Sequence, residues 1–484
     1  MSEPHDTNRN GHFFSSGVAP NLILIRICSF TQLNGFRIRA ILKKTLKFSM
    51  TNQQYNDKSK NNHKRGLYWF RHDLRLHDNA AISALCEEVS QITFVYILDD
   101  KNFRPNEFSL SSLGEHRHTF LLQTLADLKR QLAKFGHDLL IVKGSAAECL
   151  VQLLRSGTYS HLGVSEYCGY DETAELNSVK RFFDSLTVIE TSTFGLFDAQ
   201  TRPFSIEEMP DVFSPFRRKV EKYCKPLAVH PAIQRLPTPF IPTLDASFLL
   251  TLEHDLPEPS ESSLVGGETA ALSHLNTYLF DWHAASSYKE TRNALDTWKD
   301  STKLSAWLSN GSLSAREVMR QVHNFEETVE KNDSTYWIYF ELLWREFFHW
   351  LQCKYGAKWF RFSGIQGKTP STKHCPETFA RWCEGKTGYP IVDACMRQLA
   401  ETGYMSNRGR QLVASCFVHE LRQDWRYGAA WFEQQLVDYD VGSNWGNWLY
   451  LAGVGSDPRG HRQFNLQKQT EIYDPEGQFR KKWL

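Results

Sequence analysis

Residues 67–98, LYWFRHDLRLHDNAAISALCEEVSQITFVYIL, hold the pattern that decides the fold of the first part of the chain. Two short apolar runs are separated here by an amphipathic segment, and the same alternation continues to about residue 191. The apolar runs that predict strands are 67–70, 92–98, 139–142, 162–164 and 188–189. Strands that alternate with helices pair in parallel, so residues 65–195 are predicted to form an α/β domain with an open, doubly wound sheet. Ligands of such sheets bind at the carboxyl ends of the strands.

The composition is that of a folded protein of two or three domains. The chain has 484 residues, 41% of them hydrophobic, with 56 Lys+Arg against 55 Asp+Glu. These values exclude a disordered tail, a collagen and a membrane bundle. No apolar run reaches the roughly 18 residues that a membrane span needs.

The second half of the chain differs in character from the first. Residues 196–265 are rich in Pro and Ser and show little periodicity, so they are predicted to be an interdomain linker. From residue 266 the strand signal disappears and almost every window suits a helix. Residues 266–484 are therefore predicted to form an all-helical domain around one ligand or cleft.

The first 64 residues form a basic leader. They hold ten Lys/Arg and three acids, a net charge of +7, and no acid occurs between Thr7 and Asn56. Such a segment resembles a mitochondrial transit peptide. A disordered leader, or a true start at Met50, are the alternatives, and without targeting the protein is expected in the nucleus or cytoplasm.

The cysteines and aromatic residues bear on chemistry. Ten cysteines are scattered without a Cys-x-x-Cys pair or a histidine at zinc spacing, so the sequence predicts neither a disulfide framework nor a metal centre. A reducing compartment fits this pattern best. The 14 tryptophans suggest a stacking or redox role, because Trp is costly to place unless it packs, stacks or moves electrons.

A helix start at residues 300–305, DSTKLS, is a candidate phosphate site. Hydroxyls and free backbone N–H groups at a helix N-terminus stabilise a phosphate. An ordinary Ser/Thr N-cap is the alternative.

Glu341, Trp344, Arg345 and Phe348 are spaced i, i+3, i+4 and i+7 and therefore share one helix face. An acid, an indole, a guanidinium and a phenyl ring on one face are typical of the wall of a polar, aromatic cleft. The alternative is a Glu–Arg pair beside core aromatics. Such a pair contributes only about 0.2–0.5 kcal/mol and does not require the tryptophan.

Two polar segments lie farther along, at 407–410 (NRGR) and 438–440 (DYD), the second followed by a Gly/Asn/Trp-rich run at 442–448. Rigid turns that hold polar side chains toward a flat ligand would have this composition. Taken singly, a solvated turn and a solvated helix face are the alternatives.

Eight runs of sequence occur in the order and wording of one family, and together they span about 66–484. The runs are 67–79, 266–272, 288–293, 301–305, 341–347, 385–390, 406–410 and 438–448. The chain resembles the photolyase/cryptochrome family, and within it the DASH branch of the cryptochromes most closely. Any one run is a weak signal, whereas eight in order are specific.

The resemblance implies that the helical domain binds FAD folded into a U, with its pyrophosphate on the loop 301–305. The residues that match flavin-contacting positions are Tyr288, Ser301, Thr302, Lys303, Leu304, Ser305, Asn407, Arg410, Asp438, Tyr439, Asp440 and Asn444. Arg410 and Asp438 are expected to pair. Asn444 matches the position that faces flavin N5, where the repair branch has Asn and plant signalling cryptochromes have Asp. A neutral amide can hydrogen-bond reduced flavin without adding a negative charge beside it.

The resemblance also implies an electron relay and a lesion pocket. Trp382, Trp425 and Trp448 match three tryptophans that carry an electron from the surface to photoexcited flavin.

Glu341 and Trp344 match residues that meet a cyclobutane pyrimidine dimer, a lesion that must be flipped out of the base stack. Tyr450 stands where conventional dimer photolyases have a second tryptophan, as is typical of the DASH branch. A weaker grip on lesions flipped from duplex DNA would follow.

Arg292, Arg345 and Arg408 match phosphate-contacting or cleft-lining positions of the family. They would supply a local basic patch, which is needed because residues 65–484 carry a net charge of −6. Asn407 and Gln411 stand where 6-4 photolyases have two histidines, so 6-4 repair is not expected.

DASH proteins carry 5,10-methenyltetrahydrofolate on the amino-terminal domain as a light-harvesting antenna. The segment Glu166-Tyr167-Cys168 resembles the family's Glu-Val-Cys run, which makes Glu166 the predicted antenna contact. Tyr167 and the following Gly169-Tyr170 depart from the pattern.

The function that the resemblance implies is blue-light-driven repair of cyclobutane pyrimidine dimers by one electron cycled from FADH⁻ to the lesion and back. The expected partner is dimer-containing DNA, with single strands preferred over duplex, and RNA is a further alternative. The protein is expected to be a monomer that does not associate with a membrane. A photoreceptor that signals through a partner protein is the rival, although signalling members usually append a long tail after the closing pattern that ends here at 483–484. A flavoprotein that binds nucleic acid without repairing it is the third reading.

Overall fold

The computed structural model describes residues 64–197, 199–243, 249–250, 252, 264–457 and 462–484. All of these belong to one compact unit, residues 62–484. The predictions made for the basic leader fall on residues 1–63 and so lie outside the described residues.

A parallel sheet forms the centre of the amino-terminal domain. Its strands are β1 (Arg65–Phe70), β2 (Gln91–Asp99), β3 (Leu139–Gly144), β4 (His161–Glu166) and β5 (Thr187–Ser192). They are ordered β3-β2-β1-β4-β5, and a short β6 (Thr238–Pro239) also pairs with β2. Leu67 is in register with Thr93 on one side and Leu162 on the other. The five strands predicted from the apolar runs are confirmed.

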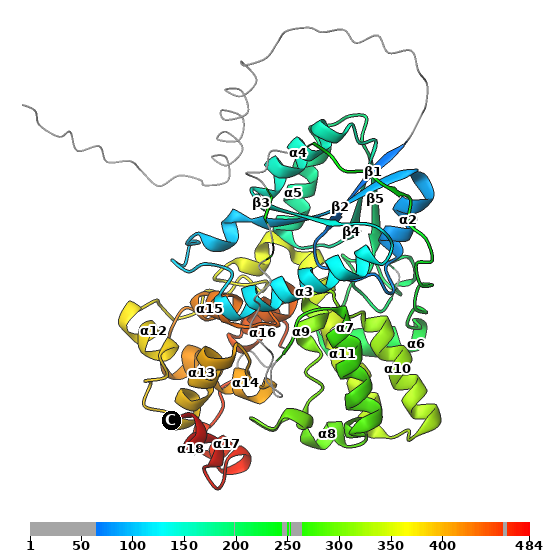
Figure 1. Ribbon diagram of the computed structural model, residues 1–484. Helices are drawn as coiled ribbons and strands as arrows, with labels where there is room; N and C mark the ends of the chain where they lie inside the picture. The colour runs from blue at the N-terminus through cyan, green and yellow to red at the C-terminus, as the bar shows by residue number, and fades with distance from the viewer. Residues whose placement is uncertain (1–63, 198, 244–248, 251, 253–263, 458–461) are drawn as a thin grey trace, which may run out of the picture. The chain divides into compact units, whose positions relative to one another are not determined.

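Helices cover both faces of the sheet, because successive side chains of a strand point to opposite faces. Leu67 and Trp69 pack with α4 (Ala146–Gly157) and α5 (Tyr170–Lys180), whereas Tyr68 and Phe70 pack with α2 (Ala80–Glu88) and α3 (Glu115–Ala133) (Figure 1). The predicted doubly wound sheet is confirmed. The strand order reverses between β1 and β4. The segments that follow these two strands contact the helical domain through Arg75 and Tyr167.

The predicted linker contains a helix, which the sequence reasoning missed. Helix α6 (Phe213–Tyr223) buries Phe213, Phe216 and Val220 in the core of the helical domain. These residues are spaced i, i+3 and i+7, a short apolar stripe that the surrounding prolines obscure. Residues of the linker thus contribute to the core of the second domain.

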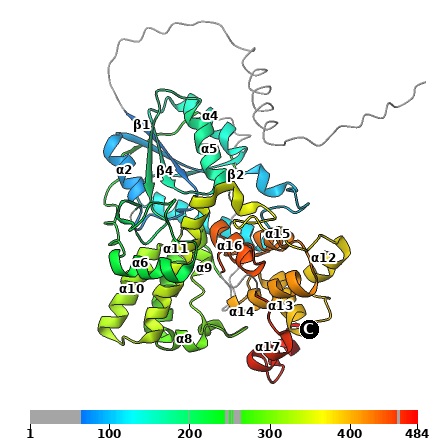
Figure 2. The ribbon, with the colours of Figure 1, turned by 180° about the vertical axis from the view of Figure 1, so that it is seen from behind.

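The second domain is helical, as predicted. Its helices are α7 (Glu268–Asn276), α8 (Tyr288–Thr291), α9 (Ser305–Asn310), α10 (Ala315–Thr328), α11 (Asp333–Tyr355), α12 (Pro376–Cys383), α13 (Pro390–Thr402), α14 (Asn407–Ser415), α15 (Trp425–Gln435), α16 (Val441–Leu451), α17 (Leu466–Tyr473) and α18 (Gln478–Trp483). Helix α11 is the longest, with 23 residues, and it packs against α6, α8, α10 and α16 (Figure 2). None of the helices in the described part of the chain combines the length and hydropathy needed to cross a membrane.

Buried polar contacts join the two domains. Arg75, which is 1% exposed, donates to the carbonyl oxygens of Thr193 (2.7 Å) and Gly311 (2.8 Å). Asp78 pairs with Arg316 of α10 at 2.9 Å. Because each buried charge here has a partner across the interface, separating the domains would leave it unpaired.

One disulfide also crosses between the domains. Cys168, two residues after β4, is bonded to Cys353 near the end of α11, 185 positions farther along the sequence. The prediction of no disulfide rested on local cysteine spacing and is wrong here, because a bond between residues so far apart leaves no local pattern.

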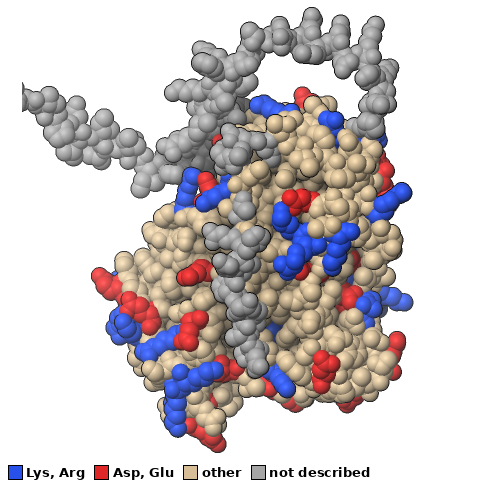
Figure 3. All heavy atoms as spheres, viewed as in Figure 1, with Lys and Arg blue, Asp and Glu red and all other residues tan. Residues whose placement is uncertain are grey.

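The surface carries both signs of charge. On the face seen in Figure 3, Lys and Arg side chains are interspersed with Asp and Glu rather than gathered into one extended basic surface. On this face, a basic patch that serves an anionic partner would therefore be local.

Candidate active site

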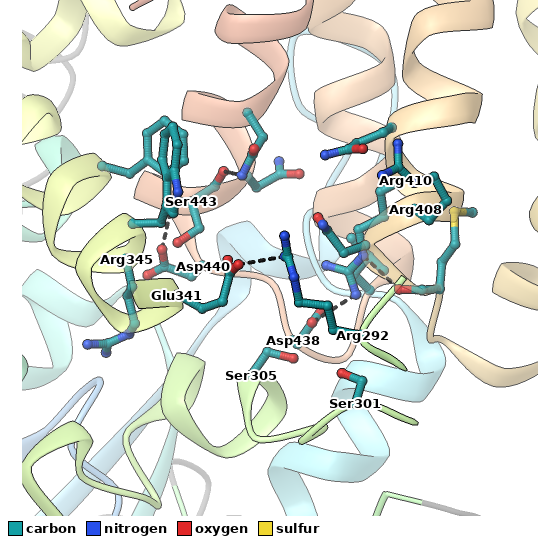
Figure 4. Close-up of a pocket in the computed structure, with 18 of the residues that line it drawn as sticks. Arg292, Ser301, Ser305, Glu341, Arg345, Arg408, Arg410, Asp438, Asp440 and Ser443 are labelled. Carbon is teal, nitrogen blue, oxygen red and sulfur yellow. Dashed lines mark hydrogen bonds and ion pairs between the residues drawn. The ribbon is translucent and has the colours of Figure 1, made fainter. Parts of the chain in front are cut away.

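A cavity of about 480 Å³ opens in the helical domain. Its walls come from the loop 301–305 and from α8, α11, α14 and α16 (Figure 4). The predicted site residues that line it are Tyr288, Arg292, Ser301, Thr302, Lys303, Leu304, Ser305, Glu341, Trp344, Arg345, Asn407, Arg408, Arg410, Asp438, Tyr439, Asp440, Asn444, Trp448 and Tyr450. Trp382, Trp425 and Glu166 lie outside it. Cavities of roughly 300–1,000 Å³ are the usual size of cofactor and ligand sites.

An ion pair lies on one side of the cavity. Arg410 Nη2 donates to Asp438 Oδ2 at 2.8 Å, and Arg410 Nε donates to the carbonyl oxygen of Met405 at 2.8 Å (Figure 4). The Asp438 side chain is only 2% exposed. The predicted pairing is confirmed. The second carboxylate oxygen, Oδ1, is buried and has no hydrogen-bond partner among the described residues, so a donor from a bound molecule would satisfy it.

The loop 301–305 forms a second side of the cavity. The carbonyl oxygen of Thr302 accepts a hydrogen bond from His274 Nε2 at 2.9 Å, and burial lowers the pKa of this histidine. Lys303 has a left-handed backbone with φ of 54° and is 4% exposed, and its ammonium donates to the Tyr404 hydroxyl at 3.1 Å. Ser305 then begins α9. The loop is thus held in shape by its neighbours while Ser301 and Ser305 flank the cavity (Figure 4).

The start of α16 forms a third side. Asp440 caps the helix by accepting from the backbone N–H of Ser443 at 2.7 Å, and it also accepts from the Tyr167 hydroxyl of the α/β domain at 3.1 Å. Asn444 is fixed one turn later, because its Nδ2 donates to the carbonyl oxygen of Ala429 at 3.0 Å. A Cβ on Gly446 would overlap the Phe348 ring, so glycine at this position lets α16 approach α11.

Glu341, Trp344 and Tyr450 lie together on the α11 side. Arg292 Nη1 donates to Glu341 Oε1 at 2.6 Å (Figure 4). Burial raises the pKa of Glu341, and the nearby guanidinium opposes this shift. The Trp344 indole stacks on Phe213 of α6, with centroids 3.7 Å apart and planes 8° apart, and meets the Tyr450 ring at 6.1 Å. One face of the indole is therefore covered by Phe213, the Phe348 ring lies 5.5 Å away, and the indole also lines the cavity.

The three predicted phosphate-contacting arginines differ in their surroundings. Arg292 pairs with Glu341, and Arg408 lies over the Tyr473 ring with Nη2 donating to Asn293 at 3.2 Å. Arg345 instead donates to the carbonyl oxygens of Phe194 (2.8 Å) and Leu308 (3.0 Å). Its guanidinium points away from Glu341 in Figure 4 and links the two domains. Arg345 also lines the cavity, so of the two roles expected at this position, phosphate contact or cleft lining, the geometry favours the second.

Comparison with known proteins places these residues in a family. Residues 66–239 match the family profile described as DNA photolyase, and residues 337–484 match that of the FAD binding domain of DNA photolyase. A cryptochrome DASH of Idiomarina loihiensis is 46% identical over 418 residues, which cover 86% of this chain and 92% of the relative. The chain belongs to the photolyase/cryptochrome family.

Other members are similar over comparable lengths. The relative from Arabidopsis thaliana named cryptochrome DASH, chloroplastic/mitochondrial, is 38% identical over 439 residues, or 86% of this chain and 75% of that protein. The crystal structure of a Synechocystis sp. cryptochrome superposes with a TM-score of 0.79 at 36% identity and covers 87% of this chain and 89% of that one. The photolyase/cryptochrome fold predicted from the sequence is confirmed.

The FAD-binding domain of the family requires polar partners for its cofactor, and the cavity residues fit such a ligand. Buried polar atoms without a partner in the described part of the chain include Asp438 Oδ1, Arg292 Nε and Arg408 Nε. All three belong to residues that line the cavity. Unpaired buried donors and acceptors cost about 1–3 kcal/mol each, so a bound cofactor that pairs with them would stabilise the fold.

The three predicted relay tryptophans of the photolyase/cryptochrome chain are all buried, at 0%, 0% and 2% exposure for Trp382, Trp425 and Trp448. Trp448 and Trp382 meet edge to face at 6.2 Å, while Trp425 contacts Trp445 at 5.7 Å. Gly428 leaves room for the Trp448 ring, since a Cβ there would overlap it. The structure thus brings two of the three into direct contact and gives none of them the surface position that the resemblance implies.

The predicted antenna segment has mixed surroundings. Glu166 is exposed at the end of β4. Tyr167 is buried, stacks on His72 at 4.2 Å and donates to Asp440, and burial raises the pKa of its phenol well above the usual value. Cys168 is in the disulfide with Cys353. The departure from the family run at Tyr167 therefore serves contacts between the domains.

Sequence reasoning missed Tyr404, which lines the cavity. Its ring lies 4.3 Å from Lys303 Nζ and 5.7 Å from the Arg410 guanidinium carbon. It thereby links the loop 301–305 to the ion pair at Asp438. A tyrosine three residues before Asn407 carries no motif, and only the fold brings it to the site.

Proposed function

We propose that the chain is a blue-light-driven enzyme that uses FAD to repair cyclobutane pyrimidine dimers in DNA, with single-stranded DNA preferred and duplex DNA accepted less well. One observation carries the proposal: Glu341 and Trp344 line the same cavity as the residues that match the family's flavin contacts. A lesion bound by these two side chains would meet a flavin in that cavity without any protein group between them.

FAD would be held by the polar side chains already described. Asp438 Oδ1 offers a buried acceptor, Arg410 fixes that carboxylate, and the hydroxyls of Ser301 and Ser305 flank the place proposed for the pyrophosphate. When bound in its reduced form, FADH⁻, the cofactor would provide the electron needed to split the dimer. Asn444 adds no charge beside the cofactor, which favours the anionic reduced flavin.

The lesion would be held by three side chains. The Trp344 indole can stack on one base, Tyr450 lies beside it, and Glu341 can hydrogen-bond a pyrimidine. Burial raises the pKa of Glu341 while Arg292 opposes this shift, and the Glu341 carboxyl group can hydrogen-bond a pyrimidine. Arg292 and Arg408, whose Nε atoms are buried while the side chains stay partly exposed, are the proposed contacts to phosphate through their terminal nitrogens. Arg345 is not included, because its donors are used at Phe194 and Leu308.

Photoreduction and light harvesting are assigned to the tryptophans and to the β4 segment. Trp448, Trp382 and Trp425 would carry the electron that reduces the flavin, with the contact between Trp448 and Trp382 as the supporting geometry. Methenyltetrahydrofolate is the proposed antenna, with Glu166 exposed and accessible to it.

A repair assay tests the proposal. Photoreduced, FAD-loaded protein is mixed with dimer-containing single-stranded DNA, duplex DNA and RNA, under blue light and in the dark, and intact pyrimidines are quantified by chromatography. Light-dependent restoration in DNA, faster for single strands, is expected. If fully reduced protein restores no pyrimidine in any substrate, the proposal is wrong, and a photoreceptor or a nucleic-acid-binding flavoprotein becomes the better account.

The leader and the assembly state form a separate proposal. We infer that the basic leader directs the protein to an organelle, in line with the name of the Arabidopsis relative, and that the protein acts as a monomer. Fusion of residues 1–64 to a fluorescent protein tests the first, because uniform nuclear and cytoplasmic fluorescence would contradict it. Light scattering of the purified protein tests the second.

A further inference from the structure

The disulfide between the two domains has a histidine beside it. Cys168 Sγ lies 3.4 Å from Nε2 and 3.8 Å from Nδ1 of His349, and Cys353 lies four residues after this histidine on α11. Residues four apart share one helix face, so His349 and Cys353 point to the same side. One sulfur, one imidazole and a second sulfur therefore converge from the β4 loop and α11.

The cluster has the composition of a metal site. The candidate ligand atoms of Cys168, His349 and Cys353 all lie within 4.8 Å of one another, and it is the single group of this kind in the described residues. Thiolates and imidazole are the ligands that zinc prefers. Zn–S and Zn–N bonds of about 2.3 and 2.0–2.1 Å at a tetrahedral angle place S and N about 3.5 Å apart. The observed 3.4 Å between Cys168 Sγ and His349 Nε2 matches this separation.

The surroundings hold the histidine in place. The imidazole stacks on Phe194 at 4.3 Å with planes 25° apart, which fixes the ring. Cys168, His349 and Cys353 are each only partly buried. The seven other described cysteines are unpaired, so the bond formed here is specific to this pair.

We infer that Cys168, His349 and Cys353 form a redox-gated binding site for a thiophilic divalent cation, with zinc as the cation of matching chemistry. In the disulfide form the sulfurs are bonded to each other and carry no thiolate, so the site is closed to metal. A dithiol reductant opens it: two electrons and two protons pass to the disulfide, the S–S bond breaks, two thiols form, and the reductant becomes a disulfide.

Cation binding then releases the two thiol protons. Two thiolates and one neutral imidazole balance the charge of a divalent cation, and three protein ligands leave a fourth position for water. The disulfide and the metal complex each link the β4 loop to α11, the helix that also carries Glu341 and Trp344. Only the metal-free dithiol leaves the two elements unlinked at this point. The inference does not depend on the proposed repair activity.

The test uses full-length protein with its flavin. One sample is reduced with a dithiol and freed of reductant under anaerobic conditions, and a second is left oxidised. Each is equilibrated with zinc and with cobalt, the excess is removed, and bound metal is counted by emission spectroscopy. We expect one zinc per reduced chain, none per oxidised chain, and a cobalt complex with thiolate charge-transfer absorption.

Variants separate this site from adventitious binding. Cys168→Ser and Cys353→Ser lie on different elements, and each is expected to weaken zinc binding at least about tenfold, the loss found even for outer-shell partners of metal sites. His349→Ala is expected to weaken it as well and to shift the cobalt spectrum. Cys375→Ser, which alters a partly buried, unpaired cysteine elsewhere, is the matched control and should bind like wild type.

Flavin content reports whether each variant is folded. The inference is overturned if reduced wild-type protein retains clearly less than one zinc per chain, if the oxidised protein binds as much, or if flavin-loaded Cys168→Ser and Cys353→Ser both bind as tightly as wild type.

Discussion

Trp344→Ala is the substitution that tests the lesion pocket most directly. The indole is held against Phe213 with planes 8° apart, so only one of its faces can meet a base. Replacement removes that stacking surface, and the residues that match flavin contacts are left unchanged. Dimer affinity should fall, and FAD content and photoreduction should be retained.

The magnitude follows from the geometry. Base–aromatic stacking contributes about 1–3 kcal/mol per base. Because Phe213 covers one face, at most one base can stack on the indole, which sets the ceiling at one such contribution. Because Phe213 already fixes the ring, little side-chain entropy is lost on binding, and the upper half of the range, about 2–3 kcal/mol, is expected. This corresponds to about a 30- to 150-fold rise in Kd.

The assay is fluorescence anisotropy with an oligonucleotide that carries one dimer, in the dark, against the same oligonucleotide without it. Trp431→Ala is the matched control, since this partly buried tryptophan of α15 does not line the cavity. It should leave Kd unchanged. The reasoning is refuted if flavin-loaded Trp344→Ala binds the damaged oligonucleotide as tightly as wild type, or if it loses affinity equally for damaged and undamaged DNA.

Three further outcomes are expected. Asp438→Asn leaves the partly buried guanidinium of Arg410 without its charged partner, and it should cost about 2–3 kcal/mol of stability with loss of FAD. The control Asp474→Asn breaks a 2.7 Å ion pair outside the cavity and should cost stability but keep FAD. Equal flavin content in the two variants would contradict the site. Trp448→Phe should reduce photoreduction to a small fraction of the wild-type rate and leave repair by chemically reduced flavin intact, with the buried Trp359→Phe as control; an unchanged rate removes Trp448 from the path. Burial raises the pKa of Glu346 from 4.5 to about 7. Between these pH values the folded chain holds a proton that the unfolded chain has released. The free energy of unfolding should therefore fall by at most about 3 kcal/mol as the pH rises through this window. Urea denaturation at several pH values checks this, and Glu346→Gln should flatten the dependence; a parallel curve would assign it to another group.

The sequence was informative where the signal is periodic or ordered. The apolar runs of the sheet are short and bounded, so their strands could be placed from composition alone. The pairing of Arg410 with Asp438 followed from ordered motifs of the family, and the structure confirms it at 2.8 Å. The placement of Glu341 and Trp344 on one wall followed from helical spacing.

The sequence was silent where contacts join distant segments. Cys168 and Cys353 are 185 residues apart, so no spacing rule pairs them. Tyr404 reaches Lys303 only because two loops meet in the fold. Arg345 matches a cleft position in sequence, yet the carbonyl groups of Phe194 and Leu308 take its donors, and nothing local to Arg345 indicates this.

The stacking of Phe213 beneath Trp344 bears on how this family can be recombined. Residues upstream of the helical domain supply the surface on which Trp344, the tryptophan of the proposed lesion pocket, rests, so the two halves are not interchangeable modules. A chimera joined near residue 266 would seat Trp344 on a foreign helix, and its substrate preference should follow the parent that donated the first half as well as the parent that donated the second. A junction placed before α6 would take Phe213 and Trp344 from the same parent and keep their contact intact.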